Sequence, residues 1–247
     1  GLATRRAQQA LGTFADEAAR RYGDTVDHWE ILNEPNKDHI DADDYTAGLK
    51  EAYNAIKSVD SGDTVITGGL APVPNTGNGM VGGVDYLEQM YDAGAKGYFD
   101  AFGYHPYTYP LMPSNSASWN GWQIMETGIR NEMVANGDGD KQIWMTEFGA
   151  PTRGAGDAVS QDQQAQIVRE AVDLAQDYDW AGPIMWYSYK DRGQNWNSKE
   201  DWFGVVGPNG EKKAVYDTFR DLGNKDGGSG NGSVTAPVEA AKPPTVT

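Results

Sequence analysis

The chain has no cysteine, which excludes disulfide bonds and thiolate metal sites. Its only histidines, His28, His39 and His105, lack the spacing of a metal-ligand pair. No apolar run approaches the roughly 20 residues that a membrane-spanning helix needs. The glycine pairs at 68–69 and 82–83 are too sparse for a phosphate-binding loop. We therefore expect no metal, no other cofactor and no membrane partner.

Basic residues are also scarce. The 247 residues include 20 Lys and Arg against 36 Asp and Glu, which gives a net charge of −16. Such a chain repels nucleic acid and anionic membranes, whereas a neutral or cationic substrate remains compatible with it. A solvated acidic surface explains the charge equally well. Aromatic residues are plentiful, with 8 Trp and 13 Tyr, enough to fill a core and to line a cleft.

Helical and strand-like patterns alternate along most of the chain. A leading helix carries an apolar stripe from Ala7 to Ala18, and a capping box of Ser160 and Gln163 opens a later helix. Strands are expected at 26–32, 64–67, 99–104, 142–146 and 183–189, and the other helices at 43–59, 84–93, 119–136 and 213–222. Strands that alternate with helices pair in parallel and indicate an α/β fold. The pattern alone does not separate an open doubly wound sheet from part of an eight-stranded barrel.

The composition changes near the C-terminus and divides the chain. Residues 1–222 form the expected folded domain. Residues 223–232 are rich in Gly, Asn and Ser, and 236–247 are rich in Pro, Thr and Val. We expect 223–247 to be a flexible linker that becomes stiffer toward its end, with a further domain after it. A disordered terminus without a function is the alternative.

Two glutamates stand where strands meet polar clusters. Glu34 follows the strand in His28-Trp29-Glu30-Ile31-Leu32-Asn33-Glu34-Pro35-Asn36, and Glu147 ends the one in Ile143-Trp144-Met145-Thr146-Glu147. A carboxylate at the end of a buried strand is costly unless it faces a polar cleft. Retaining cleavage of a glycoside needs two carboxyl groups about 5–5.5 Å apart. The amide of Asn33 is suited to bind a sugar 2-hydroxyl. The alternative is that both glutamates are structural ion-pair partners.

These two segments, the second continuing into Phe148-Gly149, resemble the fourth and seventh strands of clan A glycoside hydrolases. The flanks are most similar to the family 39-like branch, with family 5 next. The resemblance implies a (β/α)8 TIM barrel in which this chain supplies strands four to eight. It also implies that Glu34 is the general acid/base and Glu147 the nucleophile of a retaining β-glycosidase that cleaves a polysaccharide or oligosaccharide.

The same resemblance assigns the neighbouring aromatic motifs. Phe102-Gly103-Tyr104-His105-Pro106-Tyr107 would end strand six, with His105 lining the cleft and Tyr107 orienting Glu147. Ile184-Met185-Trp186-Tyr187-Ser188-Tyr189 would end strand eight, with Trp186 as the floor beside the scissile bond. Four tryptophans in loops or at helix starts are candidate outer sugar platforms, although a packing role is the favoured interpretation for each: Trp119, Trp122, Trp196 and Trp202.

The resemblance begins at the third helix of the barrel. We therefore expect roughly a hundred more residues upstream, at 30 or more per strand–helix unit, and poor folding of this piece alone. A polysaccharide substrate implies a secreted or cell-surface protein, which we expect to be a monomer.

Two other interpretations remain at this point. One is a carbohydrate-binding pseudoenzyme in which both glutamates are sugar ligands. The other is a non-glycosidase barrel or doubly wound enzyme, which would need a phosphate or cofactor motif.

Overall fold

The computed structural model describes residues 1–154 and 156–225. One helix precedes five strands, and a helical segment follows each strand. The elements are α1 (Arg5–Tyr22), β1 (His28–Asn33), α2 (Ala42–Val59), β2 (Thr64–Gly69), α3 (Gly83–Asp92), β3 (Phe102–Tyr104), α4 (Gly121–Gln123), α5 (Arg130–Ala135), β4 (Ile143–Phe148), α6 (Gln161–Gln176), β5 (Ala181–Trp186) and α7 (Ala214–Lys225). A π-helical stretch, Ile124–Ile129, joins α4 to α5, and a short 3-10 turn, Lys199–Asp201, precedes α7.

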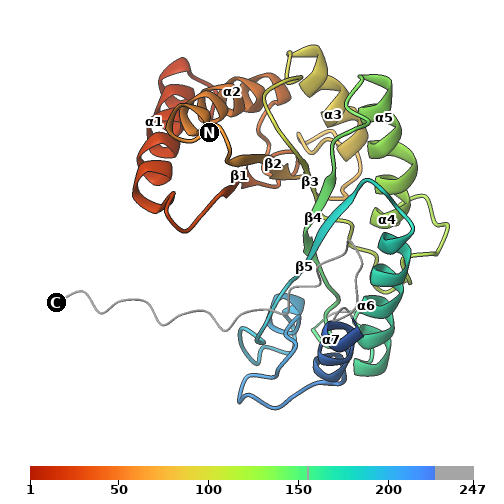
Figure 1. The fold of residues 1–247 in the computed structure, drawn as a ribbon. Helices are drawn as coiled ribbons and strands as arrows, with labels where there is room; N and C mark the ends of the chain where they lie inside the picture. The colour runs from red at the N-terminus through yellow and green to blue at the C-terminus, as the bar shows by residue number, and fades with distance from the viewer. Residues whose placement is uncertain (155, 226–247) are drawn as a thin grey trace.

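All the strands run parallel and follow one another in chain order. β1 pairs with β2, and β3 pairs with β4, which pairs with β5. Bridges from Ile66 to Ala101 and from Leu70 to Tyr104 connect β2 to β3. Figure 1 shows the strands along the inner side of a curved arc and the helices along its outer side. A doubly wound sheet carries helices on both faces, so this arrangement is that of a partial α/β barrel.

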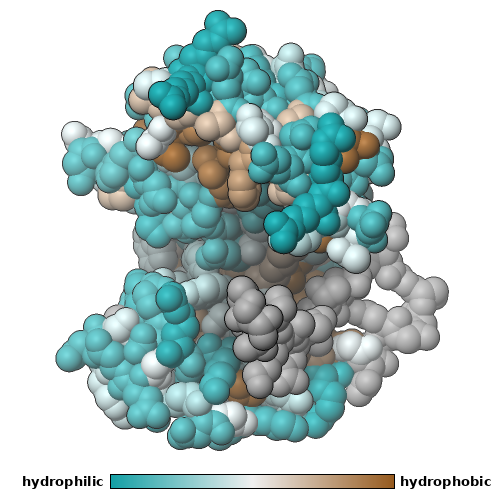
Figure 2. All heavy atoms as spheres, turned by 90° about the vertical axis from the view of Figure 1, so that its left-hand side faces the viewer, coloured by the Kyte–Doolittle hydropathy of each residue, from teal (hydrophilic) through white to brown (hydrophobic). Residues whose placement is uncertain are grey.

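The hydrophobic core lies between the strands and the helices. Tyr45 and Leu49 of α2, Leu87 of α3 and Phe102 of β3 are fully buried there. Each such side chain stabilises the fold by roughly 1.5–3 kcal/mol. The two ends of the arc differ from its centre, because β1 and β5 each have only one neighbouring strand. Leu32 of β1 is 38% exposed, for example. Seen from its open side, the molecule is hollowed between two hydrophilic rims (Figure 2).

The predicted order of elements is confirmed, but several boundaries differ. β3 is shorter than expected because the N–H groups of Asp100 and Ala101 both donate to the carbonyl of Val65, so regular pairing starts only at Phe102. β5 ends at Trp186, before the expected Tyr189. Beyond it, the chain pairs with 203–206, through bonds such as that from the Ser188 N–H to the Phe203 carbonyl.

Helix ends also deviate from prediction. Ser160 caps α6 by accepting from the Gln163 N–H at 3.1 Å, but the Gln163 side chain donates to the Pro110 carbonyl. Only half of the expected capping box is therefore formed. Helix α7 runs to Lys225, so the first three residues of the expected linker, from Gly223 onward, are helical. Most of the predicted linker, 226–247, lies outside the described residues.

Candidate active site

Glu34 is placed by a sharp turn at the carboxyl end of β1. Asn33 is paired with Gly69 of β2, and the Glu34 N–H donates to the Gly69 carbonyl at 3.0 Å. The φ of Glu34 is 43° and that of Leu32 is 68°, both in the left-handed region that side chains disfavour. Such conformations cost free energy and concentrate at functional sites. The turn leaves the Glu34 side chain only 10% exposed.

Two cationic or polar groups hold the Glu34 carboxylate. The Lys37 ammonium lies 2.5 Å from Oε2, and His105 Nδ1 lies 3.1 Å from Oε1. The Lys37 N–H also donates to the Glu34 carbonyl at 2.9 Å, so one turn fixes both residues. Burial acts to raise the pKa of Glu34, but the hydrogen bonds from His105 and Lys37 outweigh it and lower that pKa overall. Glu34 is thus held ionised in the free protein.

Glu147 lies at the carboxyl end of β4, and its surroundings differ from those of Glu34. The Tyr107 hydroxyl donates to its Oε2 at 2.9 Å, and the carboxyl side chain is 29% exposed. Burial, together with the charge of Glu147, raises the pKa of Tyr107 far above its ordinary value. Tyr107 therefore stays protonated and donates to the carboxylate at any physiological pH.

His105 lies between the two carboxylates. Its Nδ1 is 3.1 Å from Glu34 and 3.8 Å from Glu147, and the residue is fully buried. One ligand atom from each of the three side chains lies within 4.8 Å of the others. Strands β1 and β4 are separated by two other strands, so the curvature of the arc brings their carboxylates together. One oxygen of Glu34 therefore lies within 4.8 Å of an oxygen of Glu147.

The close approach of His105 depends on a glycine. A Cβ at Gly69 would collide with the His105 imidazole and with the Thr146 hydroxyl. Glu30 of β1 also bonds to residues of this region. Its Oε1 accepts from the Gly69 N–H at 2.8 Å and from Thr146 Oγ1 at 2.7 Å. One carboxylate thereby ties β1 to β2 and β4 beneath the site.

The same cluster has the donor types of a metal site, with one imidazole nitrogen and two carboxylate oxygens. However, the Lys37 ammonium already binds the second oxygen of Glu34. A divalent cation placed there would be repelled by Lys37. The position of Lys37 therefore disfavours a divalent cation at this cluster.

Two further residues, Asn33 and Trp186, were predicted to belong to the site. Asn33 is exposed at the end of β1, and its side chain bonds to no described residue. Trp186 was expected to form the floor of the cleft, but its ring packs against Phe148 of β4 and Phe219 of α7, on the helix side of the sheet. The prediction for Trp186 is therefore corrected. It is paired with Phe148 in the β4–β5 register and shares the outward direction of that residue.

Three residues that contact or adjoin the site, Glu30, Lys37 and Tyr187, were not predicted from the sequence. Glu30 and Lys37 lie four residues before and three residues after Glu34, and their polarity beside a strand end was the available signal. Tyr187 follows Trp186 and by alternation faces the opposite side of the sheet. Its ring lies 5.3 Å from that of Phe203, which lies 6.1 Å from that of Tyr107. Tyr187 is thus the aromatic of this motif that adjoins the site.

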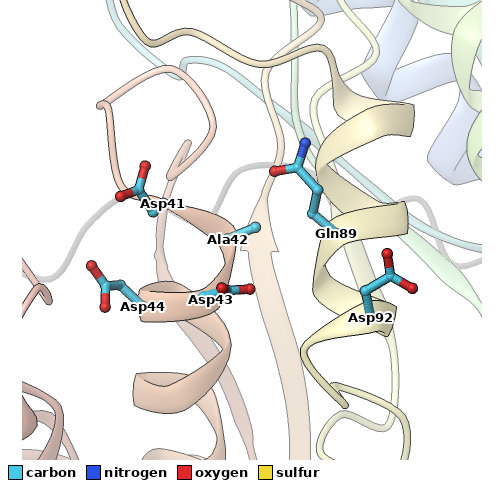
Figure 3. Close-up of a pocket in the computed structure, with 6 residues that line it drawn as sticks. All are labelled: Asp41, Ala42, Asp43, Asp44, Gln89 and Asp92. Atoms are coloured by element: carbon cyan, nitrogen blue, oxygen red, sulfur yellow. The ribbon is translucent and has the colours of Figure 1, made fainter.

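A separate pocket lies between the N-terminus of α2 and one face of α3. Figure 3 shows that Asp41, Ala42, Asp43 and Asp44 line it from α2 and its cap, and Gln89 and Asp92 from α3. Acidic residues in the first turn stabilise a helix through its dipole. That effect accounts for the aspartates of α2, and we assign the pocket no part in the chemistry.

The curved parallel arc, with paired carboxylates at its strand ends, defines the class of the protein as an α/β-barrel fold. A family model described as "Glycosyl hydrolase catalytic core" matches residues 24–210. The chain belongs to this glycosyl hydrolase family. No match was found among curated protein sequences.

Solved structures share the fold. A family 39 glycoside hydrolase from Bacteroides cellulosilyticus WH2 is 23% identical, with a TM-score of 0.65 over 86% of this chain and 44% of that one. A monomeric β-xylosidase from Caulobacter crescentus CB15 is 17% identical, with a TM-score of 0.60 over 88% and 46%. Fungal β-1,4-galactanases are 15% identical, with a TM-score of 0.64 over 87% and 68%.

The chain thus spans less than half of the first two structures. The predicted resemblance to clan A, with its family 39-like character, is confirmed by the family model together with these folds. Within the part of the chain that the structure describes, no helix has both the length and the apolar character needed to cross a bilayer.

Proposed function

We propose that the protein is a retaining β-glycoside hydrolase, with Glu147 as nucleophile and Glu34 as general acid/base. The observation that carries this proposal is the meeting of the two carboxylates, with their nearest oxygens within 4.8 Å and His105 between them. Because the proposal places these strands as the fourth to eighth of a (β/α)8 barrel, both carboxylates stand at the barrel end where catalytic groups gather.

The reaction proceeds in two displacements. In the first, a Glu147 oxygen attacks the anomeric carbon, the glycosidic bond breaks, and Glu34 gives its proton to the leaving oxygen. In the second, Glu34 takes a proton from water, whose oxygen attacks the anomeric carbon and releases Glu147 as a carboxylate. The product sugar keeps its β configuration, and both side chains return to their starting states.

The surroundings of each carboxylate support its role. Tyr107 holds Glu147 from one side at 2.9 Å, which fixes the direction of attack. Lys37 holds Glu34 in the ionised form that the second step requires. For the first step, Glu34 must be protonated. A leaving sugar that enters between Glu34 and Lys37 separates the pair and raises the pKa of Glu34 toward the value an acid needs.

The substrate we propose is a β-linked polysaccharide or oligosaccharide. Support comes from structural neighbours whose names refer to xylosidase and galactanase activity. The net charge of −16 favours a neutral glycan over an anionic one. A polymer of this kind does not cross membranes, so the proposal includes secretion or display at the cell surface. Detection of the protein in the cytoplasm alone would contradict that part.

Trapping and rescue test the assignment in the full-length protein. A 2-fluoro glycoside should esterify Glu147, as located by peptide mass spectrometry. Glu34→Ala should recover turnover of an activated aryl β-glycoside when azide is added, with a β-glycosyl azide as product. Labelling of a different residue, or full turnover by Glu147→Ala, would overturn the assignment.

The ion pair between Lys37 and Glu34 favours a second candidate, a carbohydrate-binding protein without turnover, because a permanently ionised Glu34 cannot act as an acid. That candidate predicts saturable oligosaccharide binding, which calorimetry measures, with no hydrolysis of any aryl glycoside. Covalent trapping by the 2-fluoro glycoside separates the two candidates.

A further inference from the structure

The structure divides four tryptophans of the loop-side regions into two classes. Trp122 is fully buried and Trp202 is 6% exposed, so both are packing residues. Trp119 is 54% exposed and Trp196 is 64% exposed. Trp196 differs from Trp119 in that aromatic and cation–π contacts hold its exposed ring in place.

Two side chains, Arg153 and Trp202, contact the ring of Trp196. The Arg153 guanidinium lies 4.1 Å from its ring centroid, and the ring of buried Trp202 lies 5.5 Å away at 54°. Arg153 also lies 5.3 Å from the Trp202 ring, so it contacts both aromatics. Trp202 is itself anchored by its Nε1–H, which donates to the Asn195 carbonyl at 2.9 Å. The exposed ring therefore has a defined orientation.

The loop that carries Trp196 is well braced. The Asn195 N–H donates to Asp201 Oδ2 at 2.9 Å, and the Ser198 N–H donates to the Asn195 carbonyl at 3.1 Å. Gly154, with a φ of 93°, brings the loop after β4 against the backbone of Ser198, where a Cβ would lie 2.5 Å from the carbonyl. These contacts fix the platform before any ligand arrives, which lowers the entropic cost of binding.

The platform is continuous with the catalytic residues. Phe203, the neighbour of Trp202, packs edge-on against Tyr107 at 6.1 Å and 73°. Tyr107 in turn donates to Glu147. Tyr107 and Phe203 are thus linked to Trp196 through Trp202, which precedes Phe203 by one residue in the chain and whose ring contacts that of Trp196.

We propose that Trp196 and Arg153 form an outer sugar-binding subsite for a unit of the glycan chain remote from the cleaved bond. The flat indole stacks on the apolar face of a pyranose, as aromatic side chains do with flat apolar groups. The guanidinium of Arg153 bonds to no acceptor among residues 1–154 and 156–225, so its N–H groups are available to sugar hydroxyls. This inference rests on the proposed function and adds that the enzyme binds a chain of several units.

Chain-length dependence tests the subsite in the full-length protein. Xylo-, cello- and β-1,4-galacto-oligosaccharides of two to six units are compared with an aryl monoglycoside. The wild type should gain kcat/KM with length in at least one series. Trp196→Ala should lose about tenfold on the longest substrate of that series, as expected for one lost stacking contact. Its turnover of the aryl monoglycoside should stay within about twofold of the wild type.

Two further variants sharpen the result. Phe14→Ala removes an aromatic of similar exposure, 69%, from α1 and should leave every substrate unchanged. Arg153→Gln should weaken long substrates less than Trp196→Ala does. Calorimetric titration of Glu147→Ala, with and without Trp196→Ala, should show the same loss of affinity for long ligands.

Several outcomes would overturn the subsite. They are an equal loss by Trp196→Ala on short and long substrates, no loss on any, or a wild type whose kcat/KM and affinity are independent of length. If instead no substrate is hydrolysed but long ligands still bind through Trp196, the proposed function fails and the subsite stands.

Discussion

Glu34 and Glu147 are identical side chains that the fold places in two different environments. Glu34 stands on a left-handed turn, is 10% exposed and contacts Lys37 and His105. Glu147 lies within regular strand β4, is 29% exposed and accepts from the neutral hydroxyl of Tyr107. The two carboxylates therefore differ in their partners, a cation at Glu34 and a neutral hydroxyl at Glu147, and such differences allow identical groups to take different roles. Under the proposed roles, the ammonium beside Glu34 stabilises the ionised form of the acid/base, and the hydroxyl beside Glu147 orients the nucleophile.

The largest effect should come from exchanging the two carboxylates for amides. Glu147→Gln should lower kcat on all substrates by on the order of 10⁴-fold or more, since no covalent intermediate forms. Glu34→Gln should lose about 10²–10⁴-fold on sugar leaving groups but little in the first step with a dinitrophenyl leaving group, which needs no acid. Pre-steady-state burst kinetics measure this contrast. If Glu34→Gln lost equally on both leaving groups, Glu34 would not be the general acid and the two glutamates would not differ in role.

The second test removes the Tyr107 hydroxyl that donates to Glu147. Tyr107→Phe keeps the ring but deletes the donor at 2.9 Å, so kcat should fall by about 10²-fold, as for other single donors at a reacting group. Both glycoside types should be affected alike, because the nucleophile serves both. Circular dichroism should show an unchanged fold. A loss confined to glycosides with poor leaving groups would instead indicate that Tyr107 assists Glu34 in protonating the leaving group.

The smallest change concerns Lys37 and the pH profile. Lys37→Met removes a contact that lowers the pKa of Glu34, while His105, Tyr107 and Glu147 still face the group. That pKa should therefore rise. The acid must be protonated, so activity is lost as the pH rises through this pKa. The alkaline limb of kcat/KM should move to higher pH in the variant.

Lys96→Met, which removes an exposed lysine bonded only to the Asn136 carbonyl, serves as the control and should leave the limb in place. A shift of the limb to lower pH in Lys37→Met would contradict the ion-pair assignment. Measurement of the full profile on an activated and an unactivated glycoside separates the acid step from the base step.

Much of the fold was predictable because its signals are local. Alternation, the Ser160 cap and the breaks after each helix identified five strands in the correct order. The curvature of the sheet was not predictable, since it arises from pairing between residues far apart, such as Leu70 with Tyr104. For that reason the helix–strand pattern alone did not separate an open doubly wound sheet from a barrel, and only the family resemblance indicated the barrel.

The candidate site was likewise predictable in part, where the signal was local, and unpredictable where it depended on tertiary contacts. Glu34 and Glu147 were predicted from their places at strand ends, and His105 and Tyr107 from the family resemblance; the structure brings the four side chains together. Trp186 was misplaced because the face on which a strand residue lies depends on its pairing partner. Trp186 pairs with Phe148, which faces the helices, and a residue one position further along the chain faces the site.

The amino-acid sequence by itself determined the order of the strands and which strand ends carry carboxylates, because these follow from short-range patterns of polarity. Only the tertiary structure decided that Lys37 binds Glu34, that Trp186 packs outward and that the indole of Trp196 stays open. Those outcomes depend on a left-handed turn, the β4–β5 pairing and a braced loop. Each is set by contacts between segments that the sequence keeps apart.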